Sequence, residues 1–267
     1  MTRLGVVGWP VGHSRSPQMH NAALAAAGLA GWRYQRLPVP PHLFDETVQA
    51  LPALGFRGVN VTIPHKEAAL ALADAATPAA SAIGAANTLT FEPDGHIEAE
   101  NTDAPGFLAT LPFPPAGRSA QVLGAGGSAR AVVWALVQAG AAEVRVWNRT
   151  PARARALAAE LGAVATDRVD PVDILVNCTS VGLRDPALTF KALPVRADSL
   201  NAGSCVVDMV YRDGGTELLR VAHARGAQVV DGLEILIAQG AASFERWTGR
   251  TAPRQAMREA VETIASA

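Results

Sequence analysis

The sequence predicts an α/β protein with two lobes, an N-terminal α/β domain followed by a doubly wound parallel sheet. Strand-like segments alternate with helical segments over the first 100 residues. A proline-rich stretch, residues 112–117, then interrupts the chain, and a strand, a glycine turn and a helix follow directly after it. Because a chain of 267 residues is long enough to bury two hydrophobic cores, we expect one core in each lobe.

The first lobe is expected to contain four strands and four helices. Runs of apolar residues bounded by turn residues predict strands at Leu4 to Val7, Trp32 to Leu37, Val59 to Ile63 and Thr88 to Phe91. Apolar residues at helical spacing predict helices near residues 17–27, 43–54, 65–75 and 79–84. This alternation is typical of an α/β domain.

The second lobe is expected to be a parallel sheet with helical crossovers. Its strands are predicted at residues 120–124, 143–147, 173–177, 204–208 and 227–230. The last two helices, at about 233–247 and 254–265, add no strand, so we expect them to fold back onto the first lobe. The predicted domains are therefore residues 1–102 with 236–267, and residues 103–235.

The composition indicates a globular protein that binds small molecules. Hydrophobic residues make up 49% of the chain and charged residues 18%, which excludes the disordered class. The formal net charge of -1 provides no basic field for nucleic acid or for an anionic membrane. The sequence leaves the oligomeric state open, with a homodimer as one expectation.

Further features favour a cytoplasmic protein without a metal site. Cys178 and Cys205 lie far apart in apolar strand-like runs, as expected of reduced, buried thiols. The chain starts without a basic signal-peptide region, and no apolar stretch reaches about 18 residues, so we expect neither a signal peptide nor a membrane span. The six histidines show no paired spacing with cysteine or carboxylate residues, which argues against a zinc site.

Lys66 is a candidate acid or base because lysine is rare in this chain. Lys66 and Lys191 are the two lysines among 23 Lys and Arg residues. Arginine stays protonated in proteins, whereas a lysine can exchange a proton in catalysis. Lys191 has no comparable polar neighbours in the sequence, and it shows that a lysine here can be a solvated surface residue.

Two polar segments precede Lys66. Asn60 and Thr62 alternate with apolar residues, so strand period places both on one face, which lines either a pocket or open water. Ser14 and Ser16 lie at the start of a helix that has Pro17 in its first turn. Ser16 there is typical of a helix N-cap, and a helix N-terminus with spare hydroxyls also receives a carboxylate well.

Three later polar residues allow a structural or a functional interpretation. Asp103 precedes Ala104 and Pro105 and could cap the helix that reaches Leu111, or it could be an acid for catalysis. Asn87 is either a turn residue at a strand entry or a polar ligand. Gln239 lies beside the apolar stripe of a helix, as a satisfied core amide or as a ligand for a hydroxyl. Met19 and His20 are assigned to the buried face of the first helix.

A glycine loop opens the second lobe. Residues 119–123 form a predicted strand, and a GxGxxA run leads from it into a helix. The run consists of Gly124, Ala125, Gly126, Gly127, Ser128 and Ala129. Strand, turn and helix in this order predict a Rossmann-type dinucleotide site, in which the backbone approaches a pyrophosphate at the helix N-terminus. A tight strand-to-helix turn alone would also need glycine.

The end of the next strand favours NADP over NAD. An NAD enzyme places an acid there, but this chain has Asn148, Arg149 and Thr150. Glu143 opens the strand and so lies at the wrong end. Arg149 and Arg153 are four residues apart and can converge on a 2′-phosphate, a contact worth about 1.5–3 kcal/mol. The alternative, surface arginines on a helix, is our interpretation of Arg155.

Taken together, these segments resemble the shikimate dehydrogenase family, over almost the whole chain. No single segment is decisive, but the ordered set is specific. The matching segments are residues 14–17 with His20 and Asn21, 60–66, 84–88, 101–103, the glycine loop, 148–150, 208–211, and 231–232 through 239–241. The resemblance implies reversible, NADPH-dependent reduction of the ring ketone of 3-dehydroshikimate to shikimate, in the shikimate pathway to chorismate and the aromatic amino acids.

The resemblance also implies roles for individual residues. Lys66 and Asp103 would form the acid/base pair at the reacting oxygen, and Ser14 and Ser16 would hold the carboxylate. The residues implied to bind the ring and its hydroxyls are Thr62, Asn87, Tyr211 and Gln239. Asn60, on the same strand face as Thr62, is included among the substrate-binding residues. On the cofactor side, Met209 and Gly232 would touch the nicotinamide end. Arg149, Thr150 and Arg153, beside Asn148, would contact the 2′-phosphate, and Thr179 would lie in a loop near the cofactor.

Two departures from the family pattern leave the implied acid/base pair intact. Residues 177–183 are a looser version of the family's loop near the cofactor, and Glu234 puts a charge where the family has small or apolar residues. Two alternatives stay open: a quinate/shikimate dehydrogenase of broader specificity, and a non-catalytic redox sensor that binds NADP. An acid in place of Asn148 would support the first, and loss of Lys66 or Asp103 would support the second.

Overall fold

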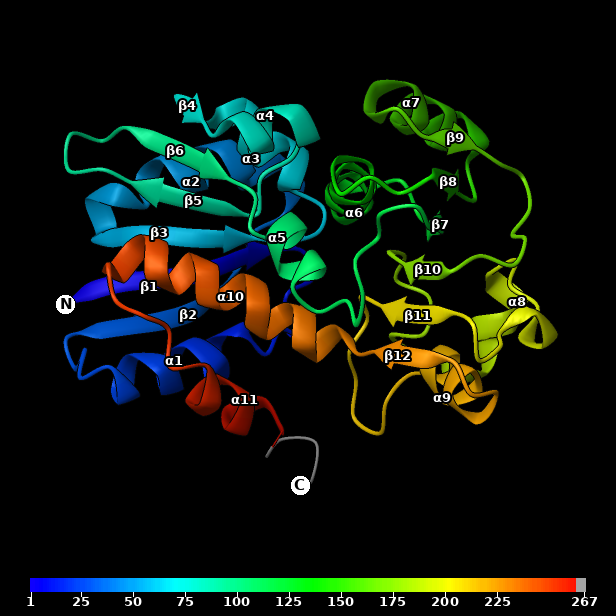
Figure 1. Cartoon of the computed structure of the whole chain (residues 1–267). Helices are drawn as coiled ribbons and strands as arrows, with labels where there is room; N and C mark the ends of the chain where they lie inside the picture. The colour runs from blue at the N-terminus through cyan, green and yellow to red at the C-terminus, as the bar shows by residue number, and fades with distance from the viewer. Residues whose placement is uncertain (263–267) are drawn as a thin grey trace. The chain divides into compact units, whose positions relative to one another are not determined.

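The computed structural model describes residues 1–262, which divide into two compact units (Figure 1). The first unit comprises residues 1–106 together with the chain from Leu236 onward, and the second comprises Phe107–Ile235. The sequence placed this boundary after residue 102. The division falls after Gly106, so Asp103 belongs to the first unit, because its short helix begins among the buried polar residues of that unit.

The first unit contains a six-stranded mixed sheet in the order β2-β1-β3-β5-β6-β4. Strands β1, β2 and β3 are parallel, and β5 runs antiparallel to both β3 and β6. The strands are β1 (Thr2–Gly8), β2 (Trp32–Pro38), β3 (Phe56–Val61), β4 (Ala75–Ala76), β5 (Thr88–Phe91) and β6 (Ile97–Glu100). The helices are α1 (Ser16–Ala26), α2 (Phe44–Ala50), α3 (Lys66–Leu72), α4 (Pro78–Ile83), α5 (Asp103–Leu108), α10 (Gly232–Thr248) and α11 (Arg254–Glu262).

The C-terminal helices return to this unit, as the sequence predicts. Helix α11 packs against α1, and α10 brings Phe244 and Trp247 into the core, where the indole Nε1 donates a hydrogen bond to the Leu89 carbonyl. Met19 and His20 are fully buried on α1, as expected. A Cβ on Gly240 would lie 2.2 Å from the Met19 Cε atom, so glycine permits the close approach of α10 to α1. Residues 263–265 of the last predicted helix lie outside the described residues.

The second unit is a doubly wound parallel sheet in the order β12-β11-β10-β7-β8-β9. The sheet consists of β7 (Ser119–Leu123), β8 (Glu143–Trp147), β9 (Val164–Ala165), β10 (Ile174–Asn177), β11 (Cys205–Asp208) and β12 (Gln228–Val230). Its helices are α6 (Gly127–Gln138), α7 (Pro151–Leu161), α8 (Thr189–Ala192) and α9 (Glu217–Ala224). The order reverses between β7 and β10, which is the switch point of a Rossmann fold.

The direction of the crossovers explains why helices cover both faces of this sheet. The chain steps outward in one direction from β7 to β9 and in the other from β10 to β12. Because parallel crossovers are right-handed, α6 and α7 cover one face and α9 covers the other. The predicted α/β class and the Rossmann-type parallel sheet are thus confirmed.

Three short strands were not predicted from the sequence. Strand β6 forms a hairpin with β5, and the two-residue strands β4 and β9 lie at the edges of the two sheets. Within residues 1–262, no helix is long and apolar enough to cross a membrane. Cys178 and Cys205 are not in a disulfide, and burial raises the pKa of the Cys205 thiol to about 11.

Candidate active site

The polar segments of the first unit lie together at one edge of its sheet, the edge at which the strands end and the loops begin. Strands β1 and β3 are parallel, so the loops that follow them both leave from this edge. Strand β5 runs antiparallel, so its first residues lie at this edge, where Asn60 pairs with Thr88 in register. Thr88 also pairs with Glu100 at the end of β6. Loops from four strands therefore meet here, although they are far apart in the sequence.

Lys66 and Asp103 face each other at this edge. Lys66 begins α3 and Asp103 begins α5, and the Nζ to Oδ2 distance is 2.5 Å. The two residues are 8% and 5% exposed, so the contact is shielded from water. An amine and a carboxylate at this distance can share or exchange a proton with a third group that reaches both. By contrast, the side chains of the ion pair between Arg57 and Glu92 in the same unit are about one-third exposed.

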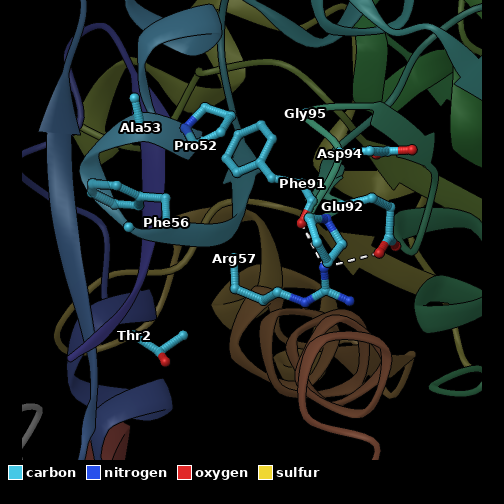
Figure 2. Close-up of a pocket in the computed structure, with 11 residues that line it drawn as sticks. Thr2, Pro52, Ala53, Phe56, Arg57, Phe91, Glu92, Asp94 and Gly95 are labelled. Atoms are coloured by element: carbon cyan, nitrogen blue, oxygen red, sulfur yellow. Dashed lines mark hydrogen bonds and ion pairs between the residues drawn. The ribbon is translucent and has the colours of Figure 1, made fainter.

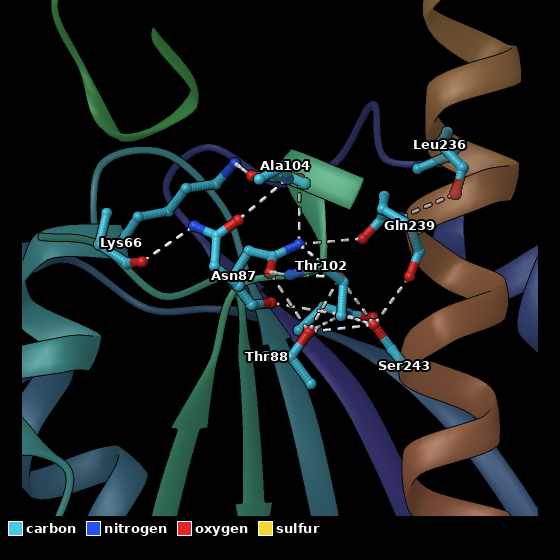
Figure 3. Close-up of polar contacts among 12 residues, drawn as sticks. Lys66, Asn87, Thr88, Thr102, Ala104, Leu236, Gln239 and Ser243 are labelled. Carbon is cyan, nitrogen blue, oxygen red and sulfur yellow. Dashed lines mark hydrogen bonds and ion pairs between the residues drawn. The ribbon is translucent and has the colours of Figure 1, made fainter. Parts of the chain in front are cut away.

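Asn87 links this pair to the rest of the cluster (Figure 3). Its Nδ2 lies 3.0 Å from Asp103 Oδ1, 2.9 Å from Thr102 Oγ1 and 3.1 Å from Gln239 Oε1, so its two hydrogens are shared among three acceptors. Its Oδ1 accepts from the Thr102 N–H at 2.7 Å. The Asn87 amide therefore orients the Asp103 carboxylate while Lys66 occupies the other oxygen.

Three hydroxyl groups, those of Thr88, Thr102 and Ser243, lie next to Asn87 and hydrogen-bond to one another. Ser243 Oγ, which is fully buried, accepts from Asn60 Nδ2 at 2.8 Å and lies 3.0 Å from Thr88 Oγ1 and 3.3 Å from Thr102 Oγ1. The sequence did not single out Ser243 or Thr102. A signal for Ser243 existed, because Gln239 and Ser243 are four residues apart on α10 and so share one helix face.

Asn60 is anchored on its other side by an aromatic stack. The Tyr34 hydroxyl donates to Asn60 Oδ1 at 2.8 Å, and the His20 ring stacks on Tyr34 with centroids 4.3 Å apart. Burial lowers the pKa of His20 to about 3, so this ring is neutral at physiological pH. The Asn60 amide thus makes hydrogen bonds to Tyr34, Thr88 and Ser243, which holds it rigidly under the cluster.

Ser14 and Ser16 form a second polar group at the same edge, in the loop that follows β1. Both are buried, their hydroxyl oxygens are 3.2 Å apart, and Ser14 Oγ also accepts from the Ser16 N–H. Thr62 follows β3, and its Cγ2 lies close to Gly8 at the end of β1. Thr62 is therefore at the base of the serine loop, where it is half-buried.

Two capping roles considered from the sequence are not realised. Helix α1 has Arg15 as its N-cap, with no side-chain capping hydrogen bond, so Ser16 is not the cap. The first turn of α5 is bonded by Asn101, whose Oδ1 accepts from the Ala104 N–H at 3.2 Å. The Asp103 carboxylate instead contacts Lys66 and Asn87. The Ser16 and Asp103 side chains are therefore available for other contacts, with Ser14 in the first case and with Lys66 and Asn87 in the second.

The glycine loop of the second unit has the features of a phosphate cradle. Gly124 adopts φ +114°, and a Cβ there would lie 3.1 Å from the Cys178 carbonyl, so the fold itself requires glycine. Gly126 is different: its backbone is extended, and a Cβ would meet nothing within 4 Å. No side chain caps the N-terminus of α6, which follows. A glycine over open space beside an uncapped helix end fits a pyrophosphate that approaches the backbone closely.

The residues predicted to contact the nicotinamide end of the cofactor lie in loops of the second unit. Asn177 Oδ1 accepts from both the N–H and the hydroxyl of Thr179, and Asn177 Nδ2 donates to Asp208 Oδ1 at 2.9 Å. A Cβ on Gly232 would lie 2.7 Å from the Met209 carbonyl, so these two residues are in contact through their backbones. Tyr211 follows in the same loop and is half-buried.

The residues predicted for the 2′-phosphate lie at the end of β8. Asn148 Nδ2 donates to the Thr150 carbonyl at 3.0 Å, which closes the turn before α7. Arg149 and Arg153 are exposed, and neither pairs with a carboxylate among residues 1–262. Glu143 lies at the start of β8, as predicted from the sequence, and it pairs with Arg145 at 2.5 Å. The end of β8 therefore presents cations and no acid.

Asp208, at the end of β11, is a buried acid that forms no ion pair with a basic side chain of residues 1–262. It is 1% exposed, and burial raises its pKa to about 7, against hydrogen bonds from the Val210 N–H and the Asn177 amide that favour the charged form. No group of three or more His, Cys, Asp or Glu side chains within residues 1–262 is arranged to hold a metal ion.

A hollow of about 520 Å³ lies elsewhere in the first unit, at the start of β3 and the turn between β5 and β6 (Figure 2). Phe56 and Phe91 line it, and Arg57 donates across it to the Phe91 carbonyl and pairs with Glu92. These residues are at the ends of the strands opposite to Lys66 and Asp103. The hollow is therefore not part of the polar cluster.

Three family models match the chain in succession. Residues 6–89 match the shikimate dehydrogenase substrate binding domain, residues 109–182 match the shikimate / quinate 5-dehydrogenase model, and residues 232–262 match the shikimate 5'-dehydrogenase C-terminal domain. The first match contains Lys66 and Asn87, and the second contains the glycine loop. The matches cover most of the segments from which the resemblance was drawn, but residues 101–103 and 208–211, with Asp103 and Tyr211, lie between the matched ranges.

Similar proteins of known name extend over most of the chain. A shikimate dehydrogenase (NADP(+)) from Methylobacterium radiotolerans is 49% identical over 92% of this chain and 91% of its own length. The structure of shikimate 5-dehydrogenase from Thermus thermophilus in complex with NADP(H) and shikimate has a TM-score of 0.89 and 44% identity, with 98% and 99% of the two chains covered. A ligand-free 5-ketofructose reductase from a Gluconobacter species has a TM-score of 0.86 and 33% identity, with 98% of each chain covered.

Proposed function

The chain belongs to the shikimate dehydrogenase family, and we propose that it is an NADP-dependent shikimate dehydrogenase, which reversibly reduces the ring ketone of 3-dehydroshikimate to the alcohol of shikimate. The observation that carries this proposal is the 2.5 Å contact between Lys66 and Asp103, with Asn87 and Gln239 beside it. By this proposal the enzyme acts in the shikimate pathway to chorismate and the aromatic amino acids.

Lys66 and Asp103 are the proposed proton donor and acceptor at the reacting oxygen. Ketone reduction adds one proton to that oxygen, and the reverse reaction removes it. The shared contact lets either residue restore the other after a proton has moved, and burial keeps water from competing for it. Asn87 holds the Asp103 carboxylate by one oxygen, which keeps its second oxygen turned to Lys66.

The remaining polar groups of the first unit suit a polyhydroxylated cyclic acid. Ser14 and Ser16 are proposed to bind the carboxylate, since two hydroxyls and the N-terminus of α1 favour an anion. The side chains of this unit proposed to bind the ring hydroxyls are Asn60, Thr62, Asn87 and Gln239. For Tyr211, which belongs to the second unit, the same role is proposed from the family resemblance alone. Gln239 Oε1 accepts from Asn87 and its Nε2 donates to the Leu236 carbonyl, so binding would exchange these contacts for substrate hydroxyls.

The second unit is proposed to bind NADP. The bound cofactor would supply the hydride that ketone reduction requires. Gly124 to Ala129 would receive the pyrophosphate at the start of α6, and Asn148, Arg149, Thr150 and Arg153 would receive the 2′-phosphate. Thr179, Met209 and Gly232 are proposed to contact the nicotinamide end. The first unit, expected from the sequence at residues 1–102 with 236–267, is the proposed substrate-binding domain, and Asp103 belongs to it. The second unit, expected at residues 103–235, is the proposed NADP-binding domain.

Initial rates with shikimate and quinate, each with NADP and with NAD, test the function. We expect the shikimate and NADP pair to have the highest kcat/KM. Comparable rates with quinate would indicate the broader quinate/shikimate dehydrogenase. Reduction of 5-ketofructose in preference to 3-dehydroshikimate would contradict the proposal, and NADP binding without turnover of any substrate would indicate a redox sensor.

A cytoplasmic location belongs to this proposal. It is supported by the two cysteines that form no disulfide and by the absence, within residues 1–262, of a helix that could cross a membrane. The homodimer stays a prediction, and light scattering of the purified protein would distinguish it from a monomer.

A further inference from the structure

Arg36, on strand β2, holds the loop that carries Ser14 and Ser16. Arg36 pairs with Val6 in the parallel register of β1 and β2, which puts its side chain beside the loop that follows β1. Its Nε and Nη2 atoms both donate to the Ser14 carbonyl, at 3.1 Å and 2.7 Å. The Nη2 atom also lies 3.2 Å from Gln18 Oε1, in the first turn of α1. One guanidinium therefore connects the strand, the serine loop and the helix.

The positive charge of Arg36 is not neutralised by these contacts. Its partners are a carbonyl and an amide oxygen, which are dipoles without net charge. No carboxylate pairs with Arg36 in the part of the chain that the structure describes. A guanidinium keeps its charge at every physiological pH, so the serine loop carries a permanent positive charge on one side.

Two neighbouring arginines, Arg15 and Arg33, are placed differently. Arg15 lies between the two serines in sequence, but its side chain is buried and donates to the Val261 carbonyl on α11 at 3.1 Å. Arg33 is exposed on the same strand as Arg36, three residues earlier, so strand alternation places it on the opposite face. Arg36 is thus the cation that contacts the serine loop through its backbone.

We propose that Arg36 is a positioning and specificity residue for the anionic end of the substrate. By fixing the Ser14 carbonyl with two hydrogen bonds, it holds the Ser14 and Ser16 hydroxyls 3.2 Å apart. Its charge also attracts a carboxylate to this loop and favours an acid over an uncharged analogue of the same shape. This inference rests on the proposed function, in which the two serines bind the carboxylate.

The test compares Arg36→Gln with Arg36→Lys and with the control Arg33→Gln. Each variant is assayed with shikimate and with its uncharged methyl ester, at saturating NADP. For Arg36→Gln we expect KM for shikimate to rise by about tenfold, at the low end of focused-charge effects on anion association, with kcat unchanged within about twofold. KM for NADP should stay within about twofold. The methyl ester has no charge but still contacts the serines, so its KM should rise by no more than the roughly threefold effect of the lost hydrogen bonds.

The two other variants distinguish the effect of the Arg36 charge from the effect of its two hydrogen bonds to the Ser14 carbonyl. Arg36→Lys retains the charge but not the two parallel contacts, so we expect a smaller rise in KM for shikimate, of about threefold, with the same dependence of KM on ionic strength as in the wild type. Arg33→Gln removes the same charge from the same strand without touching the loop, and should leave both substrates unaffected. If Arg36→Gln does not fold, Arg36→Lys still gives the ratio between acid and ester.

Each other outcome overturns the inference. Equal losses on shikimate and on its methyl ester would mean that Arg36 only supports the fold of the loop, and unchanged kinetics in Arg36→Gln would mean that it has no role. Both results leave an active wild-type shikimate dehydrogenase and so reject this inference alone. Wild-type protein that does not oxidise shikimate with NADP would reject the proposed function together with it.

Discussion

The two units present their candidate binding groups in opposite ways. In the first unit these groups are buried side chains that hydrogen-bond to one another, from Lys66 and Asp103 through Asn87 to Ser243. In the second unit they are backbone groups of a glycine loop and the exposed arginines of the segment after β8. The buried aspartates of the two units also differ. Asp103 is paired with Lys66, whereas Asp208 accepts hydrogen bonds from the neutral Asn177 amide and Val210 N–H.

This difference suggests that the first unit determines the rate of the chemical step and the second unit determines the affinity for the cofactor. A preformed network of side chains fixes the positions of acid, base and amide before a ligand arrives, which suits a chemical step that tolerates little displacement. Backbone amides and exposed cations recognise phosphate groups without a rigid network. We therefore expect changes in the first unit to affect turnover and changes in the second to affect the KM for the cofactor.

The largest effect is expected for Lys66→Ala. Loss of the amine removes the proton donor at the reacting oxygen, so kcat should fall by about 100-fold or more. The affinity for NADP should change little, since Lys66 lies in the first unit and the phosphate cradle in the second. Steady-state rates and fluorescence titration with NADPH measure the two quantities. Lys191→Ala, at the other lysine, is the control, and near-normal turnover of Lys66→Ala would reject the catalytic role.

Arg149→Ala should affect the cofactor alone. One lost charge-assisted contact to a 2′-phosphate, worth about 1.5–3 kcal/mol, raises KM for NADP by about 10- to 100-fold and leaves KM for NAD nearly unchanged. The measurement is the ratio of kcat/KM with the two cofactors. Arg155→Ala, at an exposed position of helix α7, which begins two residues after Arg149, should not alter this ratio. Equal losses with NADP and NAD would remove the 2′-phosphate role of Arg149.

Gly126→Ala should weaken cofactor binding without disturbing the fold. A Cβ at Gly126 meets no protein atom and its backbone is extended, so we expect the free energy of unfolding to change by less than about 0.5 kcal/mol. The same methyl group would stand where a pyrophosphate approaches, so KM for NADP should rise by about tenfold, the loss of one contact to a charged group. Gly31→Ala, where a Cβ also has open space, is the control. An unchanged KM for NADP would show that no ligand approaches Gly126.

The smallest effect concerns the buried aspartate of the second unit. The unfolded chain releases the Asp208 proton near pH 4, whereas the folded protein holds it to a pKa of about 7. The folded state therefore binds more protons in between, and the free energy of unfolding falls as the pH rises. Between pH 6 and pH 8 this loss is about 1 kcal/mol, or about 2–4 °C in Tm.

Asp208→Asn removes the titrating group and keeps the acceptor for Asn177 and Val210. The variant should therefore lose this part of the pH dependence of Tm and gain stability relative to the wild type at pH 8. Thermal unfolding at several pH values measures it, with the exposed Asp167→Asn as control. A slope identical to that of the wild type would mean that Asp208 is already ionised in the folded protein at pH 6.

The sequence predicted most elements of the fold but missed the hairpin of β5 and β6. A signal was present, since Pro93, Asp94 and Gly95 are typical turn residues between two strands. Strand β6 was overlooked because its sequence, Ile97-Glu98-Ala99-Glu100, is short and carries two charged residues. The two-residue strands β4 and β9 have no periodicity that a sequence could reveal. Their pairing depends on the neighbouring strand.

The candidate site was predictable as a set of residues but not as a set of contacts. Motif segments that match a family identify Lys66, Asn87 and Asp103 without reference to one another. The sequence could not reveal that Asn87 orients the Asp103 carboxylate, that Ser243 supports the cluster, or that Arg36 holds the serine loop. It also left Ser16 and Asp103 as candidate caps, and the structure assigns those helix ends to other groups.

By itself the sequence determined the alternation of strands and helices, the glycine loop, the shortage of lysine and the membership of a family, because each of these is written in local periodicity or in short ordered segments. Only the tertiary structure decided which polar groups meet. Asn87 and Gln239 are 152 residues apart, and they touch because antiparallel β5 and the returning helix α10 reach the same edge of one sheet. A local pattern specifies the face on which a side chain lies, whereas its hydrogen-bond partner depends on how distant elements pack.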